Sequence, residues 1–265
     1  MWARRPIPGT RPAEIRATPS GIFGRGLSYP GDRIAGVFTT ELFRVPLIPE
    51  ISLHLAGAGV GLFDSSGGEF RGDEPPPFWA FVWAGGQALA RYVLDHPELV
   101  RGRRVLDLGA GSGVVAIAAA RAGAASVTAA DFDPAAARAI RRNAAANGVS
   151  VTVTVAADAG PPAGTNGAAH ADDASRAGDA TRRYDVVLAG DAFYAPSVAR
   201  RMTTLLRERA AHGARVLVGD PGRGYFPERL FRLSAEYEVP VPAVLEETDV
   251  LLTGVYEMRT TSGRR

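Results

Sequence analysis

Residues 104–158 alternate between short apolar runs and runs of helix-forming residues, and this alternation constrains the fold more than any other feature of the chain. Apolar runs of about four to eight residues that end at glycine or aspartate are typical of buried strands. A helix is marked by Pro in its first turn and by Asn-Gly at its end. The expected order is strand 104–109, helix 114–123, strand 126–131, helix 134–148 and strand 149–158.

The same alternation returns after residue 183. "YDVVLAGD" (184–191) predicts a fourth strand, a helix is expected around 196–211, and "ARVLVGDP" (214–221) predicts a fifth strand. "EYEVPVPAVLEE" and "DVLLTGVYEMR" predict two late strands that form an antiparallel pair. Strands that alternate with helices along a chain assemble into a parallel sheet. The predicted fold class is therefore α/β, with a mainly parallel sheet and helices on both of its faces.

Composition indicates one domain with less ordered additions. Residues 1–36 are rich in Arg, Pro and Gly without periodicity, which predicts a poorly ordered extension; an organelle-targeting segment is the alternative. Residues 37–258 form the single domain, and its apolar stretch 39–62 is expected to cover one edge. Residues 159–182 lack large apolar side chains, which predicts a mobile surface insertion. Residues 259–265 form a charged tail.

Residue usage argues against several kinds of site and partner. The 30 basic residues are all arginine and nearly balance 28 acidic residues. Because they are scattered, they predict no nucleic-acid-binding face. The absence of cysteine excludes disulfides and thiolate sites, and the four histidines lie too far apart for a local metal motif. No apolar run approaches the roughly 18 residues of a membrane span. We expect a cytoplasmic monomer that holds no metal.

The first strand runs into a glycine loop, "VLDLGAGSGVV", with Gly109, Gly111 and Gly113. Glycines let a backbone turn sharply and approach a ligand closely. The dinucleotide fingerprint G-x-G-x-x-G fails here because Val114 stands at its sixth position. Asp107 stands inside the strand end, where an anion would oppose a pyrophosphate but suits a cation. S-adenosylmethionine carries an ammonium and a sulfonium and has no phosphate.

Acidic residues also end the next two strands. Asp131 ends the second strand, where a carboxylate can accept both ribose hydroxyls of a nucleoside. Phe132 follows it and is expected to pack on the adenine, and Asp158 ends the third strand, where an acceptor would meet the adenine amino group. Any one of these aspartates can instead cap a helix. Together with the glycine loop they favour S-adenosylmethionine over NAD.

Four segments in this order resemble a known family. They are "PPFWAFVWAGGQALARYVLDHPELVRGRRVLDLGAGSG", "AADFDP", "VVLAGDAFY" and "VLVGDPGRGYF". The resemblance covers about residues 40–258 and is to the seven-β-strand methyltransferases that methylate lysines of the electron-transfer-flavoprotein β subunit. It implies a Rossmann-like, seven-stranded, mostly parallel twisted sheet with an antiparallel C-terminal strand pair. This sequence departs from the family at Ala84, where the family has proline, and in the length of its 159–182 insertion.

The resemblance implies transfer of a methyl group from S-adenosylmethionine to a protein lysine, with the electron-transfer-flavoprotein β subunit as the protein partner. Relatives leave two further substrates open, a small nicotinamide-like amine and a ribosomal protein. A non-catalytic S-adenosylmethionine-binding partner protein is the alternative from a different functional class.

The "GDAFY" segment is the predicted catalytic element because it follows the fourth strand. Asp191 is expected to accept a hydrogen bond from the incoming amine or from the cofactor's amino group. Tyr194 is expected to orient the amine through its hydroxyl or its ring face. The alternative is structural, with Asp191 as the N-cap of the next helix and Phe193 and Tyr194 as packing.

"GDPGRGYF" supplies two more candidates for substrate contact, Asp220 and Arg223. Arg223 is expected to pair with an acidic face of a protein substrate. The alternative for Asp220 is a tight turn that its carboxylate stabilises.

Two tryptophans four residues apart, Trp79 and Trp83, stand between three prolines and two glycines. This spacing fits one buried face of a helix. Their place just before the first strand favours the site instead, with Trp83 and Gly85 at the cofactor and Trp79 at the substrate. Gly85 and Gly86 are expected to let the backbone pass near the ligand before a helix over "QALARYVLDHP".

Overall fold

The structure is a computed structural model of the 265-residue chain and describes residues 33–34, 38–57, 76–155, 184–242, 245–246 and 248–259. Asp158, the 159–182 insertion and residues 1–32 and 260–265 lie outside the described residues. Arg33–Ile34, inside the predicted extension, form a short strand that pairs with Phe38 and Thr39. Regular structure therefore begins before the predicted domain boundary at residue 37.

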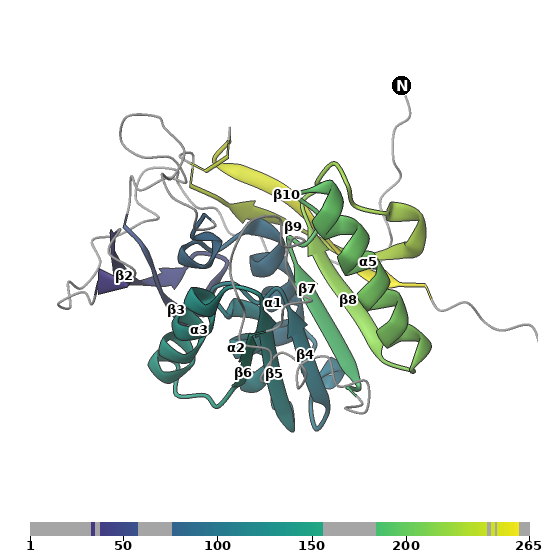
Figure 1. Cartoon of the computed structure of the whole chain (residues 1–265), viewed down its shortest axis with the longest axis horizontal. Coiled ribbons are helices and arrows are strands. Elements are labelled where there is room, and N and C mark those ends of the chain that lie inside the picture. Colours follow the sequence, from purple (N-terminus) through teal and green to yellow (C-terminus); the bar gives the residue numbers. More distant parts are fainter. Residues whose placement is uncertain are drawn as a thin grey trace, which may run out of the picture.

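The described elements form two sheets (Figure 1). In chain order they are β1 (Arg33–Ile34), β2 (Phe38–Val45), β3 (Ile48–Ala56), the 3-10 helix η1 (Phe78–Ala80), α1 (Ala84–Asp95), η2 (Pro97–Leu99), β4 (Arg104–Leu108), α2 (Val114–Arg121), β5 (Ser126–Asp131), α3 (Pro134–Ala146), β6 (Thr152–Val155), β7 (Val186–Gly190), α5 (Pro196–Ala211), β8 (Arg215–Asp220), η4 (Glu228–Leu230), β9 (Phe231–Pro240) and β10 (Val250–Met258). The small sheet has the order β1-β2-β3, and the large sheet has the order β6-β5-β4-β7-β8-β10-β9.

The large sheet confirms the predicted fold class. Strands β4 to β8 pair in parallel, whereas β10 is antiparallel to both β8 and β9. Successive side chains of a strand point to opposite faces. Val105 accordingly packs with the α1 and α2 layer, while Leu106 packs on the other face with Met202 and Leu206 of α5. Figure 1 shows α5 in front of β7 and β8, on the side of the sheet opposite to α1.

The late strands differ from the prediction in their limits. β10 matches the predicted run, but β9 begins at Phe231 and ends at Pro240, before all of "VPAVLEE" (241–247). Pro cannot donate to a ladder and is found at strand ends. The face of β9 and β10 beside α5 is closed by rings rather than by a helix: Phe226 lies 5.1 Å from Phe231 and 4.6 Å from Tyr256, measured between ring centroids.

The stretch predicted to cover a domain edge forms the β2–β3 hairpin beside α3 (Figure 1). Asn143 of α3 and Asn147, the C-cap of that helix, hold it. The Asn147 side chain accepts from Ser52 N at 3.0 Å and donates to Ser52 O at 2.6 Å, and Asn143 Oδ1 accepts from His54 N at 2.7 Å. Asn143 Nδ2 also donates to Ser112 O at 2.8 Å, so one side chain ties the hairpin to the glycine loop.

Among the residues that the structure describes, no helix has the length and apolar character needed to cross a bilayer.

Candidate functional site

A cavity of about 180 Å³ opens at the carboxyl ends of β4, β5 and β7, where ligands bind in open α/β sheets. It is lined by the glycine loop, the start of α3, the segment before α1, the loop after β7 and the first turns of α5. The lining residues are Pro76, Phe78, Trp79, Trp83, Gly109, Gly111, Asp131, Phe132, Asp133, Ala136, Gly190, Asp191, Ala192, Tyr194, Val198, Met202 and Arg223.

The glycine loop lies at the cavity as predicted, but its three glycines do different work. All have positive φ, at 69° for Gly109, 53° for Gly111 and 85° for Gly113. Gly109 and Gly111 line the cavity. Gly113 is the N-cap of α2 and faces α3, where an added Cβ would lie 3.2 Å from Ile140 Cγ2. Gly113 therefore shapes the loop. It lies outside the cavity lining, so its position does not support the predicted direct contact with the cofactor.

Asp107 lies beneath the loop rather than in the cavity lining. Its side chain is buried, and Oδ2 accepts a hydrogen bond from Ala116 N at 2.9 Å. Burial raises the pKa of this carboxyl to about 7, although the bond from Ala116 opposes the shift. The carboxyl therefore stabilises the first turn of α2, and its influence on a cationic ligand would act through the loop.

Asp131 lines the cavity with both of its carboxylate oxygens fixed by backbone N–H groups. Oδ2 accepts from Gly111 N at 2.8 Å, and Oδ1 accepts from Asp133 N at 3.0 Å. Burial raises the pKa of this carboxyl to about 6, although these two bonds favour its ionised form. Each oxygen has further acceptor capacity. Phe132 lines the cavity beside Asp131, so a carboxylate and an apolar ring are presented together, as a ribose and an adenine require.

Asp191 has an unusual backbone. Its φ of 50° is the one positive φ outside glycine in the described residues, and such conformations cluster at functional sites. Its N–H donates to Gly219 O at 2.9 Å. Its carboxylate accepts from Gly85 N through Oδ2 and from Arg223 Nε through Oδ1, the latter at 3.0 Å.

The capping alternative for Asp191 does not fit this geometry. Helix α5 begins at Pro196, and its N-cap is Ala195, without a side-chain cap. Burial raises the pKa of the Asp191 carboxyl, and the neighbouring guanidinium of Arg223 opposes that shift. The carboxylate is thus directed toward the cavity and toward Arg223 rather than toward the helix.

Tyr194 stands at the cavity's opening. Its side chain is 42% exposed, and its ring centroid lies 5.5 Å from that of Phe78. Burial of part of the ring raises the pKa of its phenol to about 12, so the hydroxyl keeps its proton at neutral pH. Its neighbour Phe193 is fully buried against Phe226 and Phe231. The packing alternative, which named both residues, therefore describes Phe193 but not the exposed Tyr194.

The two residues predicted in the loop after β8, Asp220 and Arg223, have different positions relative to the cavity. Asp220 is fully buried, outside the lining, and Oδ1 accepts from Gly222 N at 2.8 Å and from Arg223 N at 2.7 Å. Asp220 therefore stabilises a tight turn, as the alternative expected. Its buried side chain is not placed for direct contact with a substrate. Arg223 lines the cavity, with its guanidinium 5.9 Å from the Trp83 ring centroid.

The two tryptophans do not share a helical face. Trp79 lies in η1 with 4% exposure, whereas Trp83 is the N-cap of α1 and donates from Nε1 to Phe78 O at 3.0 Å. Both line the cavity. Helix α1 starts at Ala84, earlier than predicted, and so includes Gly85. A Cβ on Gly85 would lie 2.2 Å from Gly219 O, so this glycine permits close approach to a strand end rather than to a ligand.

Comparison with known proteins places the chain in a family. It is 37% identical to the electron transfer flavoprotein beta subunit lysine methyltransferase of Rattus norvegicus over 187 residues, which cover 68% of this chain and 66% of the rat protein. It is 39% identical to the Danio rerio protein of the same name over 199 residues, which cover 73% of this chain and 70% of that protein. The chain belongs to the electron transfer flavoprotein beta subunit lysine methyltransferase family.

Two further similarities accompany this membership. The family model "Ribosomal protein L11 methyltransferase (PrmA)" matches residues 88–189, which include the glycine loop and Asp131. The solved ribosomal protein L11 methylase of Lactobacillus delbrueckii subsp. bulgaricus is 19% identical with a TM-score of 0.44, covering 68% of this chain and 81% of that one. The predicted family is confirmed by the curated relatives, which are named as methyltransferases. Those relatives extend beyond the match by about a third of their length.

Sequence reasoning missed several residues at this cavity. Met202 and Val198 reach the cavity from α5, for which the sequence predicted a helix but no site residue. Asp133 was recognisable, because Asp-Pro at a helix start predicts the cap that it forms with Ala135 N. Glu246 had no sequence signal, since its partner Arg223 belongs to a different loop. Within the described residues no group of three His, Cys, Asp or Glu has the arrangement of a metal site.

Proposed function

We propose that this chain transfers a methyl group from S-adenosylmethionine to the ε-amine of a protein lysine, and that its substrate is the electron-transfer-flavoprotein β subunit. The observation that carries the proposal is that Asp191 and Tyr194, on one loop, line the same cavity as the glycine loop and Asp131. The name that these curated relatives share supports the choice of substrate.

The residues on the glycine-loop side fit the nucleoside part of the methyl donor. Asp131 would accept the two ribose hydroxyls, because backbone N–H groups already fix both of its oxygens. Phe132 would pack against the adenine, and the bare backbone of Gly109 and Gly111 would allow close approach. When bound, the donor supplies an activated methyl group on a sulfonium, so the protein has mainly to position and desolvate the amine.

The lining residues around Asp191 and Tyr194 fit a lysine side chain. Only an uncharged amine attacks, and free lysine titrates near 10.4, so the site must remove a proton. The buried carboxylate of Asp191 would bind the arriving ammonium, and its raised pKa favours it as proton acceptor. The protonated hydroxyl of Tyr194 and the rings of Phe78 and Trp83 would orient the side chain.

Two alternatives make different predictions. A small-molecule N-methyltransferase encloses its substrate, whereas the exposed Tyr194 at this cavity suits the end of a lysine presented by a protein surface. A non-catalytic binding partner has no need of a strained backbone at Asp191, which costs about 1–3 kcal/mol. The finer expectations, a cytoplasmic location, a monomeric state and no nucleic-acid ligand, belong to this proposal and rest on composition.

A transfer assay tests the proposal. The purified chain is incubated with labelled S-adenosylmethionine and the electron-transfer-flavoprotein β subunit, and labelled residues are located by mass spectrometry. We expect label on lysines of the β subunit and none with Asp191→Asn. The chain contains no lysine, so methyllysine cannot come from automethylation. The absence of transfer to any lysine of the β subunit, with transfer to nicotinamide or a ribosomal protein, would replace the proposed substrate.

A further inference from the structure

The guanidinium of Arg223 divides its donors between two carboxylates. Nε donates to Asp191 Oδ1 at 3.0 Å, while Nη2 donates to Glu246 Oε1 at 2.7 Å and Nη1 to Glu246 Oε2 at 3.4 Å. The guanidinium also lies 5.9 Å from the Trp83 ring centroid. Glu246 therefore occupies the forked end of Arg223 and leaves a single donor, Nε, for Asp191.

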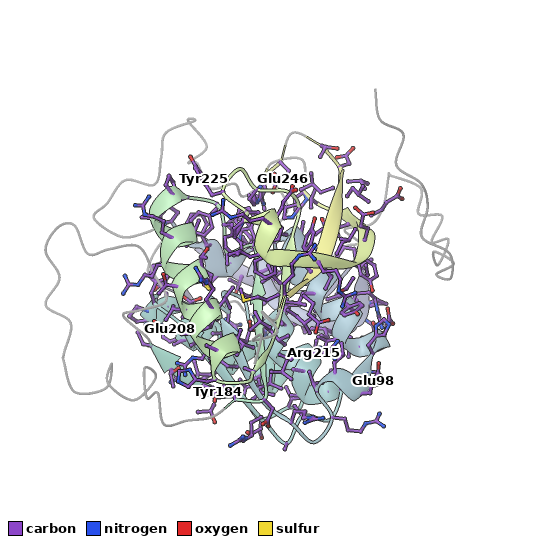
Figure 2. All side chains as sticks on the ribbon, turned by 90° about the vertical axis from the view of Figure 1, so that its right-hand side faces the viewer. Glu98, Tyr184, Glu208, Arg215, Tyr225 and Glu246 are labelled. Carbon is purple, nitrogen blue, oxygen red and sulfur yellow. The ribbon has the colours of Figure 1, made fainter. Side chains whose placement is uncertain are left out.

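The segment between β9 and β10 holds Glu246 in place. Glu246 N donates to Pro242 O at 3.3 Å, and Val241 N donates to Asp249 O at 3.0 Å, so the connection closes on itself. Leu245 packs against the cluster of Trp79 and Phe81. Figure 2 labels Glu246 and Tyr225 at one end of the molecule and Arg215 toward the other. Glu246 lies next to the cavity, because its partner Arg223 is one of the lining residues.

Burial distinguishes this pair from an ordinary surface ion pair. The side chains are 23% exposed for Arg223, 16% for Glu246 and 8% for Asp191. Exposed pairs contribute little, whereas a poorly solvated charge that loses its partner must find another. For Arg223 the nearest other carboxylate is that of Asp191, to which it is already bonded through Nε.

This arrangement has a chemical consequence for the amine. A guanidinium fork that is free to turn binds a carboxylate through two parallel hydrogen bonds. If Arg223 bound Asp191 in that way, it would fill the acceptor positions that an incoming ammonium needs. With Glu246 in place, the guanidinium is bonded to two carboxylates, those of Asp191 and Glu246. More carboxylates than guanidinium groups therefore meet here, which favours a second cation.

We propose that Glu246 is a positioning residue for the methyl-transfer reaction, because it holds the fork of Arg223 away from Asp191 and so keeps that carboxylate available to the substrate amine. The identity of the amine as a lysine rests on the proposed function. The positioning itself rests on the contacts of Arg223, and it makes Glu246 part of the site.

The kinetic test compares Glu246→Gln with Glu257→Gln. Glu257 is a matched control because it pairs with Arg215 and Arg232 on a different part of the sheet. With the β subunit as substrate, Glu246→Gln is expected to raise KM for the protein about tenfold while the Kd of S-adenosylhomocysteine stays within about twofold, and Glu257→Gln is expected to change neither. Glu246→Asp, which keeps the charge, is expected to recover part of the loss.

A substrate-free measurement separates this inference from the proposed function. The Asp191 carboxyl is titrated by 13C NMR in the wild type and in both variants. The charged groups around it are Arg223, Glu246 and Asp220. Removal of the Glu246 charge and a closer Arg223 both favour ionised Asp191, so its midpoint should move to lower pH in Glu246→Gln and stay unchanged in Glu257→Gln. An unchanged midpoint in Glu246→Gln would overturn the inference, whereas a wild type that methylates no lysine would overturn only the proposed function.

Discussion

The carboxylate of Asp191 accepts a hydrogen bond from the backbone N–H of Gly85, a residue 106 positions earlier in the chain. The contact requires two glycines. A Cβ on Gly85 would lie 2.2 Å from Gly219 O, and a Cβ on Gly219 would lie 2.0 Å from Gly85 O. The first turn of α1 therefore meets the ends of β7 and β8 where no side chain intervenes. This junction fixes Trp83, which precedes α1, relative to Asp191.

Substitution at this junction should disturb folding and catalysis together. Gly85→Ala places a methyl group against the Gly219 carbonyl and Asp191, and overpacking of this kind costs about 1–3 kcal/mol. Displacement of Asp191 should also lower kcat/KM by about 100-fold. Urea unfolding and the transfer assay measure both effects. Gly86→Ala is the matched control, since its Cβ meets only Val114 Cγ1 at 3.3 Å, and equal losses in the two variants would contradict this account.

Tyr194 should contribute to turnover but little to stability. Tyr194→Phe removes a hydroxyl from a 42% exposed side chain, so we expect an unchanged melting temperature and a kcat lower by about 100-fold. Because the pKa of this phenol is raised to about 12, no activity limb from its ionisation should appear below pH 10 or so. Tyr225→Phe alters a similarly exposed tyrosine outside the cavity lining and should keep wild-type kcat. A Tyr194→Phe enzyme of wild-type kcat would remove the hydroxyl from the mechanism.

The two tryptophans should separate cofactor binding from stability. Trp83→Leu removes the ring next to the cavity and Arg223, and loss of an aromatic contact with a cation weakens binding about tenfold. Trp79→Leu removes a nearly buried ring and should lower the melting temperature more than Trp83→Leu does. Calorimetry with S-adenosylmethionine and thermal unfolding test the pair. Unchanged cofactor affinity in Trp83→Leu, together with a large loss of stability, would assign this ring to the core.

Much of the fold follows from the sequence, because period and punctuation are local signals. The strands and helices from 104 to 155 and the helix 196–211 match their predictions to within a few residues. The sequence predicted the β2–β3 hairpin only as an apolar segment at the domain edge. Its anchors are the side chains of Asn143 and Asn147, about 90 residues later in the chain, and no local pattern reveals such contacts. The true extent of β9 depends on its pairing with β10, which lies beyond the reach of local patterns.

The site was predictable where a residue's place follows from the end of its strand. Asp131, Phe132, Asp191 and Tyr194 all line the cavity, as the carboxyl ends of parallel strands require. Asp107, Asp220 and Gly85 do not, because each satisfies a nearby backbone or permits close packing instead. Whether such a residue contacts a ligand or stabilises the fold depends on which residues pack against it, and these can be far away in the sequence. The roles of these residues toward a ligand remain predictions.

Cofactor affinity should depend on pH through Asp131. Burial raises the pKa of this carboxyl from 3.8 to about 6, and the ionised form is the one that accepts the ribose hydroxyls. Affinity for S-adenosylmethionine should therefore rise as pH increases through about 6 and level off near 7. Calorimetry across this range should show the rise in the wild type and its loss in Asp131→Asn.

The same ionisation affects stability with the opposite sign. The folded protein holds a proton on Asp131 that the unfolded chain has already released between pH 3.8 and about 6, so this group's contribution to the free energy of unfolding falls as pH rises through that window. The control for this effect on stability is Asp185→Asn. Asp185 precedes β7, and its hydrogen bonds with Arg104 lower the pKa of its carboxyl to about 2, below the window in which Asp131 ionises. A pH-dependent affinity that persists in Asp131→Asn would assign the effect to another group.

The central claim is that the methyl donor and the lysine meet in the cavity between Asp131 and Asp191. A crystal structure with S-adenosylhomocysteine, the demethylated product, tests it most directly. The account predicts the ribose hydroxyls on Asp131, the adenine against Phe132, and the sulfur directed toward the end of the cavity formed by Asp191 and Tyr194. A product bound elsewhere, or bound in this cavity with its sulfur directed away from Asp191, would contradict the account.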